Sequence, residues 1–241
     1  MDASAYLARS LKQVRAATLF SATLQPINYY IDTLGGDKNE DPHLILPSPF
    51  PIDNLKVLVA PKVSVKYKNR DKTYQEVADY IHAFIKNKVG NYFIYSPSYE
   101  YMQQLLSYLS LEDYDYYVQT KDMEEVERES FLLNFQTSPK KTTLGFLVLG
   151  GAFSEGVDLV SDRLIGAVVI GIGMPRINFQ SDNISQYYKD KGLPGHDYAY
   201  LNPGMNKIMQ AVGRVIRSEE DRGAVLLIDI EAATILPLSK A

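Results

Sequence analysis

The chain has 241 residues and a net charge of −4, and it contains no cysteine, which excludes disulfides, thiolate metal sites and a cysteine nucleophile. Hydrophobic residues make up 46% and charged residues 22% of the chain, a composition that is typical of globular domains and excludes a disordered protein. No apolar stretch reaches the roughly 18 residues of a membrane span, and the N-terminus lacks the apolar centre of a signal peptide, so we expect a cytoplasmic protein.

The first part of the chain predicts one strand, one helix and a linker. Residues 16–20 (AATLF) form a short apolar run that predicts a strand. Residues 27–36 predict a short helix that ends at its two glycines. Residues 37–54 are rich in Pro, Asp and Asn, which is typical of a linker. The main domain is therefore expected over residues 55–241.

From residue 55 onward, apolar runs alternate with amphipathic segments. In the clearest helix, 73–90, Thr73 and Glu76 have the spacing of a capping box, and apolar residues recur at helical spacing: Val77, Tyr80, Ile81, Phe84 and Ile85. Further helices are expected at 98–110, 122–136 and 205–218, and strands at 55–60, 91–96, 115–119, 143–150, 164–173 and 223–229. This order predicts an α/β fold with a mostly parallel sheet and helices on both of its faces.

Four segments contain the residues that could carry chemistry: 21–24 (SATL), 96–102 (SPSYEYM), 150–159 (GGAFSEGVDL) and 210–229. Ligands gather at the carboxyl ends of parallel strands, and we expect these loops at that edge. The segment 150–159 is either a phosphate-binding loop or an ordinary turn. It is not a P-loop, because no lysine follows its last glycine.

The segment 210–229 contains two arginines. In a helix over 205–218, Gln210, Arg214 and Arg217 project from one side, opposite the apolar residues Ile208, Val212, Val215 and Ile216. Guanidinium groups donate paired hydrogen bonds to phosphate oxygens. A glycine inside a helix costs about 1 kcal/mol relative to alanine, so Gly213 indicates a close approach to the backbone. The alternative interpretation is a solvent-exposed basic face.

Together these segments resemble the motifs of a superfamily-two helicase of the DinG/XPD-like branch. Residues 19–36 resemble its motif III, 92–102 motif IV, 150–159 motif V and 210–223 motif VI. The stretches 48–51 (SPFP) and 66–71 (KYKNRD) resemble landmarks between motifs III and IV. The resemblance implies a RecA-like second motor domain, a P-loop NTPase-like fold without its own P-loop.

The resemblance also implies roles for individual residues. Arg214 and Arg217 would be catalytic arginine fingers for ATP bound against a first motor domain. Five residues would assist ATP binding: Gln210, Gly213, Glu155, Gly156 and Asp158. Three would couple nucleotide state to DNA: Ser21, Ala22 and Thr23. Three would contact the DNA backbone: Ser98, Tyr99 and Ser154.

The implied partners are the N-terminal motor domain of the same full-length protein and single-stranded or forked DNA, in DNA repair or replication. ATP and Mg²⁺ would be bound mainly by that first domain, and unwinding would run from 5′ to 3′. The chain contains neither a P-loop lysine nor an acidic magnesium box, and it has no cysteine for an iron–sulfur cluster. We therefore expect a C-terminal fragment that hydrolyses no ATP alone, with residues 1–36 as a remnant of the first domain.

Two other interpretations stay open. One is a nucleotide-binding α/β enzyme that is not a helicase, although the sequence shows no base grouped with a nucleophile. The other is a regulatory or interaction module without helicase activity. One departure from the family is Glu231, which stands where the family often has an arginine.

Overall fold

The computed structural model describes residues 2–154, 159, 161–173 and 178–229. They fall into two compact units. As far as they are described, the larger unit holds residues 48–173 and 207–229, and the smaller unit holds residues 2–47 and 178–206. The division of the sequence into 1–36, 37–54 and 55–241 stays a prediction.

The larger unit is built on a six-stranded sheet with the strand order β1-β6-β5-β2-β4-β3. All neighbouring strands run parallel. The strands are β1 (Leu55–Ala60), β2 (Asn91–Ser96), β3 (Asp115–Val118), β4 (Thr143–Val148), β5 (Gly166–Ile170) and β6 (Gly223–Ile228). Every residue of β2, β4 and β5 is buried, which explains their near-continuous apolar sequences. The predicted parallel sheet is confirmed.

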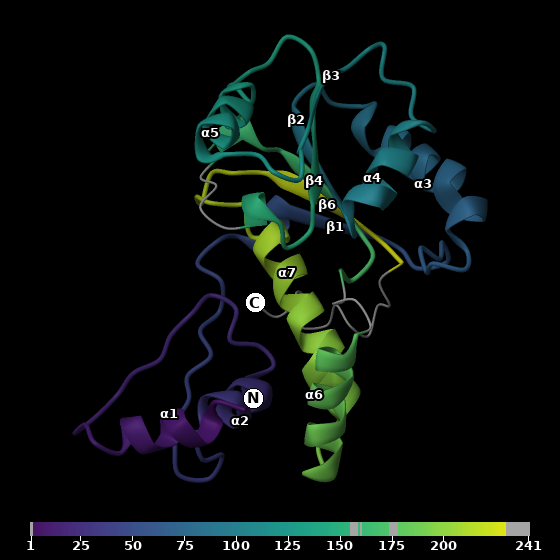
Figure 1. Cartoon of the computed structure of the whole chain (residues 1–241). Helices are drawn as coiled ribbons and strands as arrows, with labels where there is room; N and C mark the ends of the chain where they lie inside the picture. The colour runs from purple at the N-terminus through teal and green to yellow at the C-terminus, as the bar shows by residue number, and fades with distance from the viewer. Residues whose placement is uncertain (1, 155–158, 160, 174–177, 230–241) are drawn as a thin grey trace. The chain divides into compact units, whose positions relative to one another are not determined.

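Helices cover both faces of this sheet (Figure 1). Helices α3 (Arg70–Ile85) and α4 (Tyr99–Leu106) lie on one face, and α5 (Glu125–Leu133) lies on the other. Alternate residues of β2 pack against the helices on opposite faces of the sheet. Ile94 belongs to the core under α3 and α4, while the Phe93 ring packs edge-on against Phe135, just after α5, with ring centroids 4.9 Å apart. The predicted two-sided layering is confirmed.

Helix α3 begins at Arg70, three residues earlier than predicted. The Thr73 hydroxyl donates to the carbonyl of Ser64 at 2.9 Å, inside the helix, so the predicted capping box with Glu76 is wrong. Among the predicted apolar residues, Val77, Ile81 and Ile85 are buried, whereas Tyr80 is 38% exposed and Phe84 is partly buried. Tyr74 and Ala78 complete the buried face in their place.

The smaller unit contains α1 (Ser4–Leu11), α2 (Ile27–Leu34), α6 (Phe179–Asp190) and a π-helical turn, Asp197–Leu201. Helix α2 ends at Gly35, whose φ of 79° is left-handed, as the glycine pair predicts. Helix α6 was not predicted, although the Asn178 side chain caps it by accepting a hydrogen bond from the Ser181 N–H at 2.9 Å. The chain then enters α7 (Asn202–Val212).

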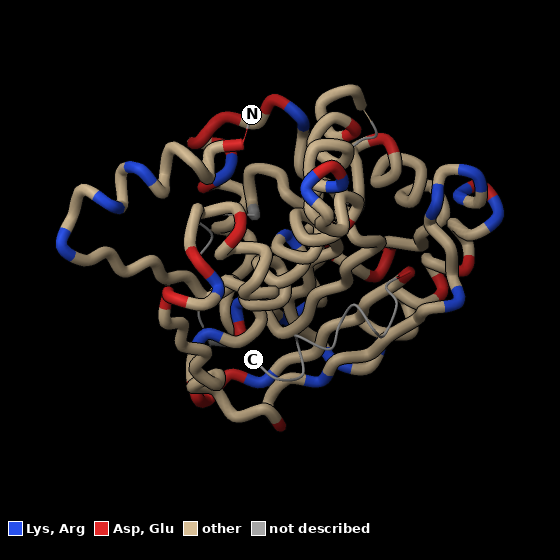
Figure 2. The backbone as a smooth tube through the Cα atoms, turned by 90° about the horizontal axis from the view of Figure 1, so that it is seen from below, with Lys and Arg blue, Asp and Glu red and all other residues tan. Residues whose placement is uncertain are grey.

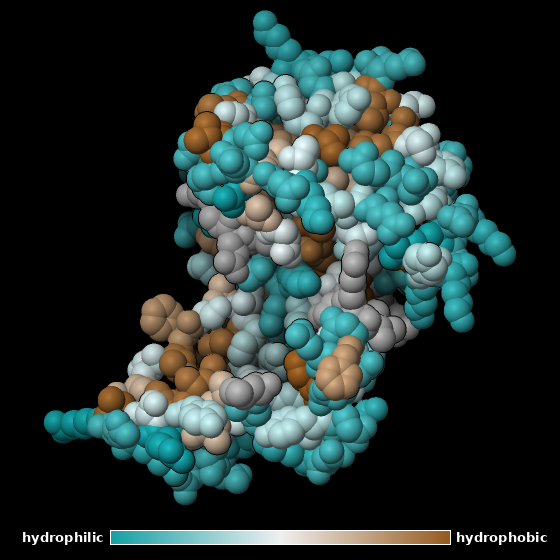
Figure 3. Space-filling view, viewed as in Figure 1, coloured by the Kyte–Doolittle hydropathy of each residue, from teal (hydrophilic) through white to brown (hydrophobic). Residues whose placement is uncertain are grey.

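The strand predicted at residues 16–20 is wrong. These residues have no regular structure, all of them are exposed, and Phe20 is 89% exposed. A strand needs a neighbouring strand to pair its backbone groups. The six-stranded sheet does not include residues 16–20. Figure 3 shows brown, hydrophobic surface on this unit. Its exposed apolar side chains include Val14, Leu19, Phe20, Leu44, Ile45 and Leu46.

Candidate functional site

The arginine segment follows helix α7 and is not part of it. Helix α7 ends at Val212, and the chain continues as a turn in which the Val215 N–H donates to the carbonyl of Val212 at 3.0 Å. The helix predicted over 205–218 is therefore wrong beyond Val212. Gly213 marks this boundary, because glycine is a poor helix former. Gln210 lies in the last turn of α7, half-buried.

This turn lies at the amino-terminal edge of the sheet. The Val215 side chain fills the space at Gly223, the first residue of β6, where a Cβ would clash with it. The Asn54 amide, directly before β1, donates to the carbonyl of Glu219 at 2.8 Å. The backbone of the arginine turn therefore lies at the amino-terminal edge, whereas Lys207, earlier in the same chain segment, lies at the carboxyl edge.

The two arginines differ in exposure. Arg214 is buried, with 7% of its surface exposed, whereas Arg217 is exposed. Burial of the Tyr95 hydroxyl raises its pKa, and the charges of Arg214 and Arg217 oppose this rise. Both guanidinium groups therefore act electrostatically on the sheet face that Tyr95 occupies. For Arg214, the alternative of a solvent-exposed basic face does not hold.

The backbone that carries Arg217 is fixed by one carboxylate. An oxygen of Asp221 accepts hydrogen bonds from the N–H groups of Arg217 and Ser218, each at 2.8 Å. The Asp221 N–H in turn donates to the Ser218 hydroxyl at 3.2 Å. Asp221 was not predicted as a site residue, although aspartate is a common turn residue. Arg217 is thus presented from an ordered turn.

A second group of polar residues lies at the carboxyl edge. Ser98 caps α4, where its hydroxyl accepts from the Tyr101 N–H at 3.2 Å. The Gln119 amide N–H donates to the Tyr99 hydroxyl at 2.9 Å, and its carbonyl oxygen accepts from the Val148 N–H at 2.9 Å. Gln119 therefore ties the ends of β3 and β4 to the beginning of α4 and orients Tyr99.

Lys207 brings a positive charge to the same edge. Its Nζ donates to the carbonyl of Gly173 at 3.2 Å, and its chain lies against Gly150, where a Cβ would lie 2.7 Å from Lys207 Cδ. Gly150 follows β4 and Gly173 follows β5. Partial burial lowers the pKa of Lys207, because a desolvated ammonium is less stable. Neither Lys207 nor Gln119 belongs to a motif, so neither was predicted from the sequence.

The remaining predicted site residues belong to two other segments, 21–24 and 150–159. Ser21 and Thr23 lie in the smaller unit, with their hydroxyl oxygens 3.3 Å apart in an exposed loop that includes Ala22. Ser154 ends the 3₁₀ turn Ala152–Ser154, and its side chain is outside the description. The predicted ATP-binding residues Glu155, Gly156 and Asp158 lie outside the described residues.

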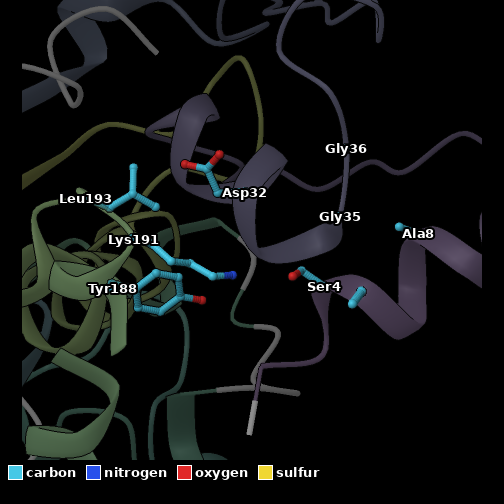
Figure 4. Close-up of a pocket in the computed structure, with 9 residues that line it drawn as sticks. Ser4, Ala8, Asp32, Gly35, Gly36, Tyr188, Lys191 and Leu193 are labelled. Carbon is cyan, nitrogen blue, oxygen red and sulfur yellow. The ribbon is translucent and has the colours of Figure 1, made fainter. Parts of the chain in front are cut away.

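The smaller unit contains a pocket of about 430 Å³ that none of the predicted site residues lines (Figure 4). Its charged groups are already paired. Asp32 binds Lys38 at 2.8 Å, and Lys191 binds Asp2 at 3.0 Å. The pocket therefore offers no uncompensated charge to a ligand and is not the candidate site.

The same described residues offer neither a metal cluster nor a membrane helix. They hold no cluster of three His, Asp or Glu side chains that could bind a metal ion. None of their helices has the length and apolar character needed to cross a bilayer. Figure 2 shows Lys and Arg interspersed with Asp and Glu along the backbone, so local clusters rather than overall charge must attract an anionic partner.

Known sequences resemble this chain along most of its length. A probable ATP-dependent helicase of Methanocaldococcus jannaschii is 27% identical over 225 residues, which cover 87% of this chain and 33% of that relative. The ATP-dependent DNA helicase DinG of Photobacterium profundum is 26% identical, over 88% of this chain and 31% of that relative. The chain spans about a third of the length of these curated relatives.

Solved structures confirm the predicted RecA-like fold. An XPD structure without ligand superposes with a TM-score of 0.72 at 23% identity, over 95% of this chain and 47% of that one. A second XPD helicase structure gives 0.71 at 24% identity, over 95% and 41%. The family model described as the helicase C-terminal domain matches residues 81–234, more than half of the chain, including both the arginine turn and the Ser98 loop. The chain therefore belongs to the helicase C-terminal domain family.

Proposed function

We propose that this chain is the C-terminal motor domain of an ATP-dependent DNA helicase and that it completes an ATP site together with an N-terminal motor domain. The observation that carries the proposal is the pair Arg214 and Arg217, one buried and one exposed, on a turn that Asp221 fixes within the family-matched region. Relatives named as ATP-dependent DNA helicases support the same activity.

Arginine suits this role for chemical reasons. Its planar guanidinium donates two parallel hydrogen bonds to a phosphate and stays charged at any physiological pH. Charge develops on the transferred phosphoryl group during hydrolysis, and a donor held in place beforehand stabilises that charge without having to reorganise. The Asp221 hydrogen bonds hold the Arg217 backbone in this way. Gln210, Gly213, Glu155, Gly156 and Asp158 are proposed to assist ATP binding.

We propose that DNA is bound at the opposite, carboxyl edge. Ser98 and Tyr99 lie at the start of α4, and the ammonium of Lys207 lies at the ends of β4 and β5. Ser154 is proposed to join them, and Ser21, Ala22 and Thr23 to couple nucleotide state to this contact. Phosphate contacts of this type position a strand without reading its sequence.

Mg²⁺ would neutralise phosphate charge during hydrolysis. We propose that this ion is bound mainly by the other motor domain, as the resemblance implies. We propose the N-terminal motor domain and single-stranded or forked DNA as the partners. DNA repair or replication is the proposed process, and the cytoplasm is the proposed location.

The chain alone is expected to show no ATP turnover, with or without single-stranded DNA. The physical reason is that its 241 residues contain no lysine-bearing P-loop to hold the triphosphate. A coupled assay of phosphate release on the purified chain measures this. Robust DNA-stimulated turnover by the chain would contradict the shared ATP site.

Replacing Gln119 with alanine is expected to weaken single-stranded DNA binding without unfolding the protein. The buried Gln119 side chain orients Tyr99, and its loss leaves the Val148 N–H without this acceptor. Losing such hydrogen bonds costs about 1–3 kcal/mol of stability, which a thermal melt would detect separately. Gln136→Ala, at an exposed glutamine, is the control. DNA affinity equal to that of the unaltered protein would contradict the role of Gln119 as a positioning residue.

A further inference from the structure

Residues 61–69 link β1 to α3 along the carboxyl edge of the sheet, and the stretch 66–71 begins in this segment and continues into α3. The Val65 N–H donates to a carboxylate oxygen of Asp229, directly after β6, at 2.8 Å. A Cβ on Gly171, directly after β5, would lie 3.0 Å from a methyl carbon of Val65. The segment therefore crosses the ends of β6 and β5 toward β2, at the edge where Ser98 lies.

The segment is held in one conformation by hydrogen bonds at its base. The Thr73 hydroxyl donates to the Ser64 carbonyl at 2.9 Å, and the Asn69 amide donates to the Ser64 hydroxyl at 3.1 Å. The Arg70 Nε–H donates to the Val65 carbonyl at 3.1 Å. Val63 and Val65 are buried, whereas Lys66, Tyr67 and Lys68 are exposed. An ordered base thus presents three side chains to solvent.

Tyr67 is an exposed aromatic residue beside the proposed DNA contacts. It is 80% exposed, so its ring does not serve the core. The Arg70 guanidinium lies 5.5 Å from the centre of the Tyr67 ring and 5.3 Å from the centre of the Tyr101 ring. The Tyr101 N–H in turn donates to the Ser98 hydroxyl. A short chain of contacts therefore connects Tyr67 to the beginning of α4.

We propose that Lys66, Tyr67 and Lys68 form a stacking platform for single-stranded DNA, which extends the DNA contacts beyond Ser98 and Tyr99. An unpaired base stacks on the exposed ring of Tyr67, and the two lysine ammonium groups bind the flanking phosphates. The combination of an exposed aromatic ring and cations is what single-strand binding requires. A duplex offers no free base face to such a ring. The platform rests on the proposed function, because it lies at the same DNA-binding edge.

The test measures binding of a fluorescent oligothymidylate to the chain by anisotropy over a range of salt concentrations. Tyr67→Ala is expected to lower the affinity about 5-fold to 160-fold, from the stacking energy of one base. Tyr67→Phe keeps the ring and is expected to bind like the unaltered chain. Lys66→Ala with Lys68→Ala is expected to lower the slope of log affinity against log salt by about 1.4, or 0.7 per phosphate contact.

Matched controls come from the same chain. Lys86 and Lys88 are exposed at the other end of α3, so their double alanine variant makes the same charge change away from the platform. Tyr80, farther along α3 in the same unit, is 38% exposed, and Tyr80→Ala removes an exposed ring away from the platform. Both controls are expected to leave affinity and salt slope unchanged. The exposure of Tyr67 means that its replacement leaves the core intact, which a thermal melt checks.

Two results would overturn the platform. The first is equal affinity of Tyr67→Ala and the unaltered chain while Tyr99→Ala weakens binding, in which case the proposed DNA contacts at α4 stand without the platform. The second is equal loss in Tyr67→Ala and in either control, which indicates non-specific attraction. If the unaltered chain fails to bind the oligonucleotide even at low salt, both the platform and the proposed DNA contacts at this edge are wrong.

Discussion

Replacement of Arg217 by alanine in the full-length protein is expected to lower kcat for ATP hydrolysis by about 10³–10⁵. This factor corresponds to roughly 4–7 kcal/mol of lost transition-state stabilisation, at 1.36 kcal/mol per decade. The reason is that Arg217 is exposed on an ordered turn, where its guanidinium can reach a phosphate held by another domain. Because the side chain is exposed, folding is expected to be unchanged. Steady-state phosphate release and a thermal melt measure the two effects.

Arg214 is expected to respond differently because it is buried. Arg214→Ala removes packing as well as charge and is expected to lower the free energy of unfolding by about 1–3 kcal/mol. Arg214→Lys keeps the charge but loses the planar guanidinium, which donates two hydrogen bonds at once. This variant therefore separates the effect on the free energy of unfolding from the effect on ATP turnover. We expect the lysine variant to fold and to remain deficient in hydrolysis.

A third arginine supplies the control for both. Arg222 is exposed and lies directly before β6 in the same segment, so Arg222→Ala makes the same change in net charge. The kcat of the Arg222→Ala variant for ATP hydrolysis is expected to equal that of the unaltered protein. If Arg222→Ala loses as much turnover as Arg217→Ala, the effect is one of general charge, and the arginine-finger assignment is wrong.

Gly35→Ala is expected to lower the free energy of unfolding of the smaller unit by about 2–5 kcal/mol. Gly35 has a φ of 79°, and this left-handed conformation costs another residue about 1–2 kcal/mol. A Cβ there would also clash with the carbonyl oxygen of Ser4 and lie 3.0 Å from the Cβ of Ala8. Such overpacking costs roughly 1–3 kcal/mol. The clash separates α1 from α2, which together close the loop that carries Ser21 and Thr23.

Gly192 provides a matched control in the same unit. Its φ is 75°, but no atom lies within 4 Å of a Cβ built on it. Gly192→Ala therefore introduces the left-handed strain alone, and the difference between the two variants isolates the packing of α1 on α2. Thermal unfolding and hydrogen exchange of the α1 amides measure it. Equal destabilisation by both substitutions would show that α1 does not pack on Gly35.

The parallel sheet could be predicted from the sequence because strands buried on both faces leave continuous apolar runs. Phe146 in β4 and Val168 in β5 are both fully buried, and neither strand alternates with polar residues. Sequence periodicity could not show that residues 16–20 lack a partner strand, since apolar character is the same with or without a neighbour. A strand depends on pairing, which is a property of the whole fold.

The position of the arginines could not be predicted from local pattern either. Residues 205–218 have helical spacing, yet the helix ends at Val212, and the turn that follows packs against Gly223 at the amino edge. Which edge a segment reaches depends on the direction in which α7 crosses the sheet, and this direction is set by tertiary packing. The motifs thus named residues to examine but did not give their place in the fold.

Some residues of the candidate site had no signal in the sequence. Gln119 follows a strand like many loop residues, and its importance comes from burial and from its bonds to Tyr99 and Val148. Lys207 lies on a helix among other polar residues, and only the fold places it against Gly150. Their roles depend on contacts between segments that are distant in sequence.

The binding of ADP with aluminium fluoride, which mimics the transferring phosphoryl group, tests the role of the arginine turn most directly. The measurement compares the affinity of the full-length protein for this complex with its affinity for ADP alone, in the unaltered protein and in Arg217→Ala. We expect the substitution to weaken the complex strongly and to leave ADP binding nearly unchanged, since the arginine acts on charge that develops in the transition state. An equal loss of affinity for both ligands, or no loss of affinity for the aluminium fluoride complex, would contradict the shared ATP site.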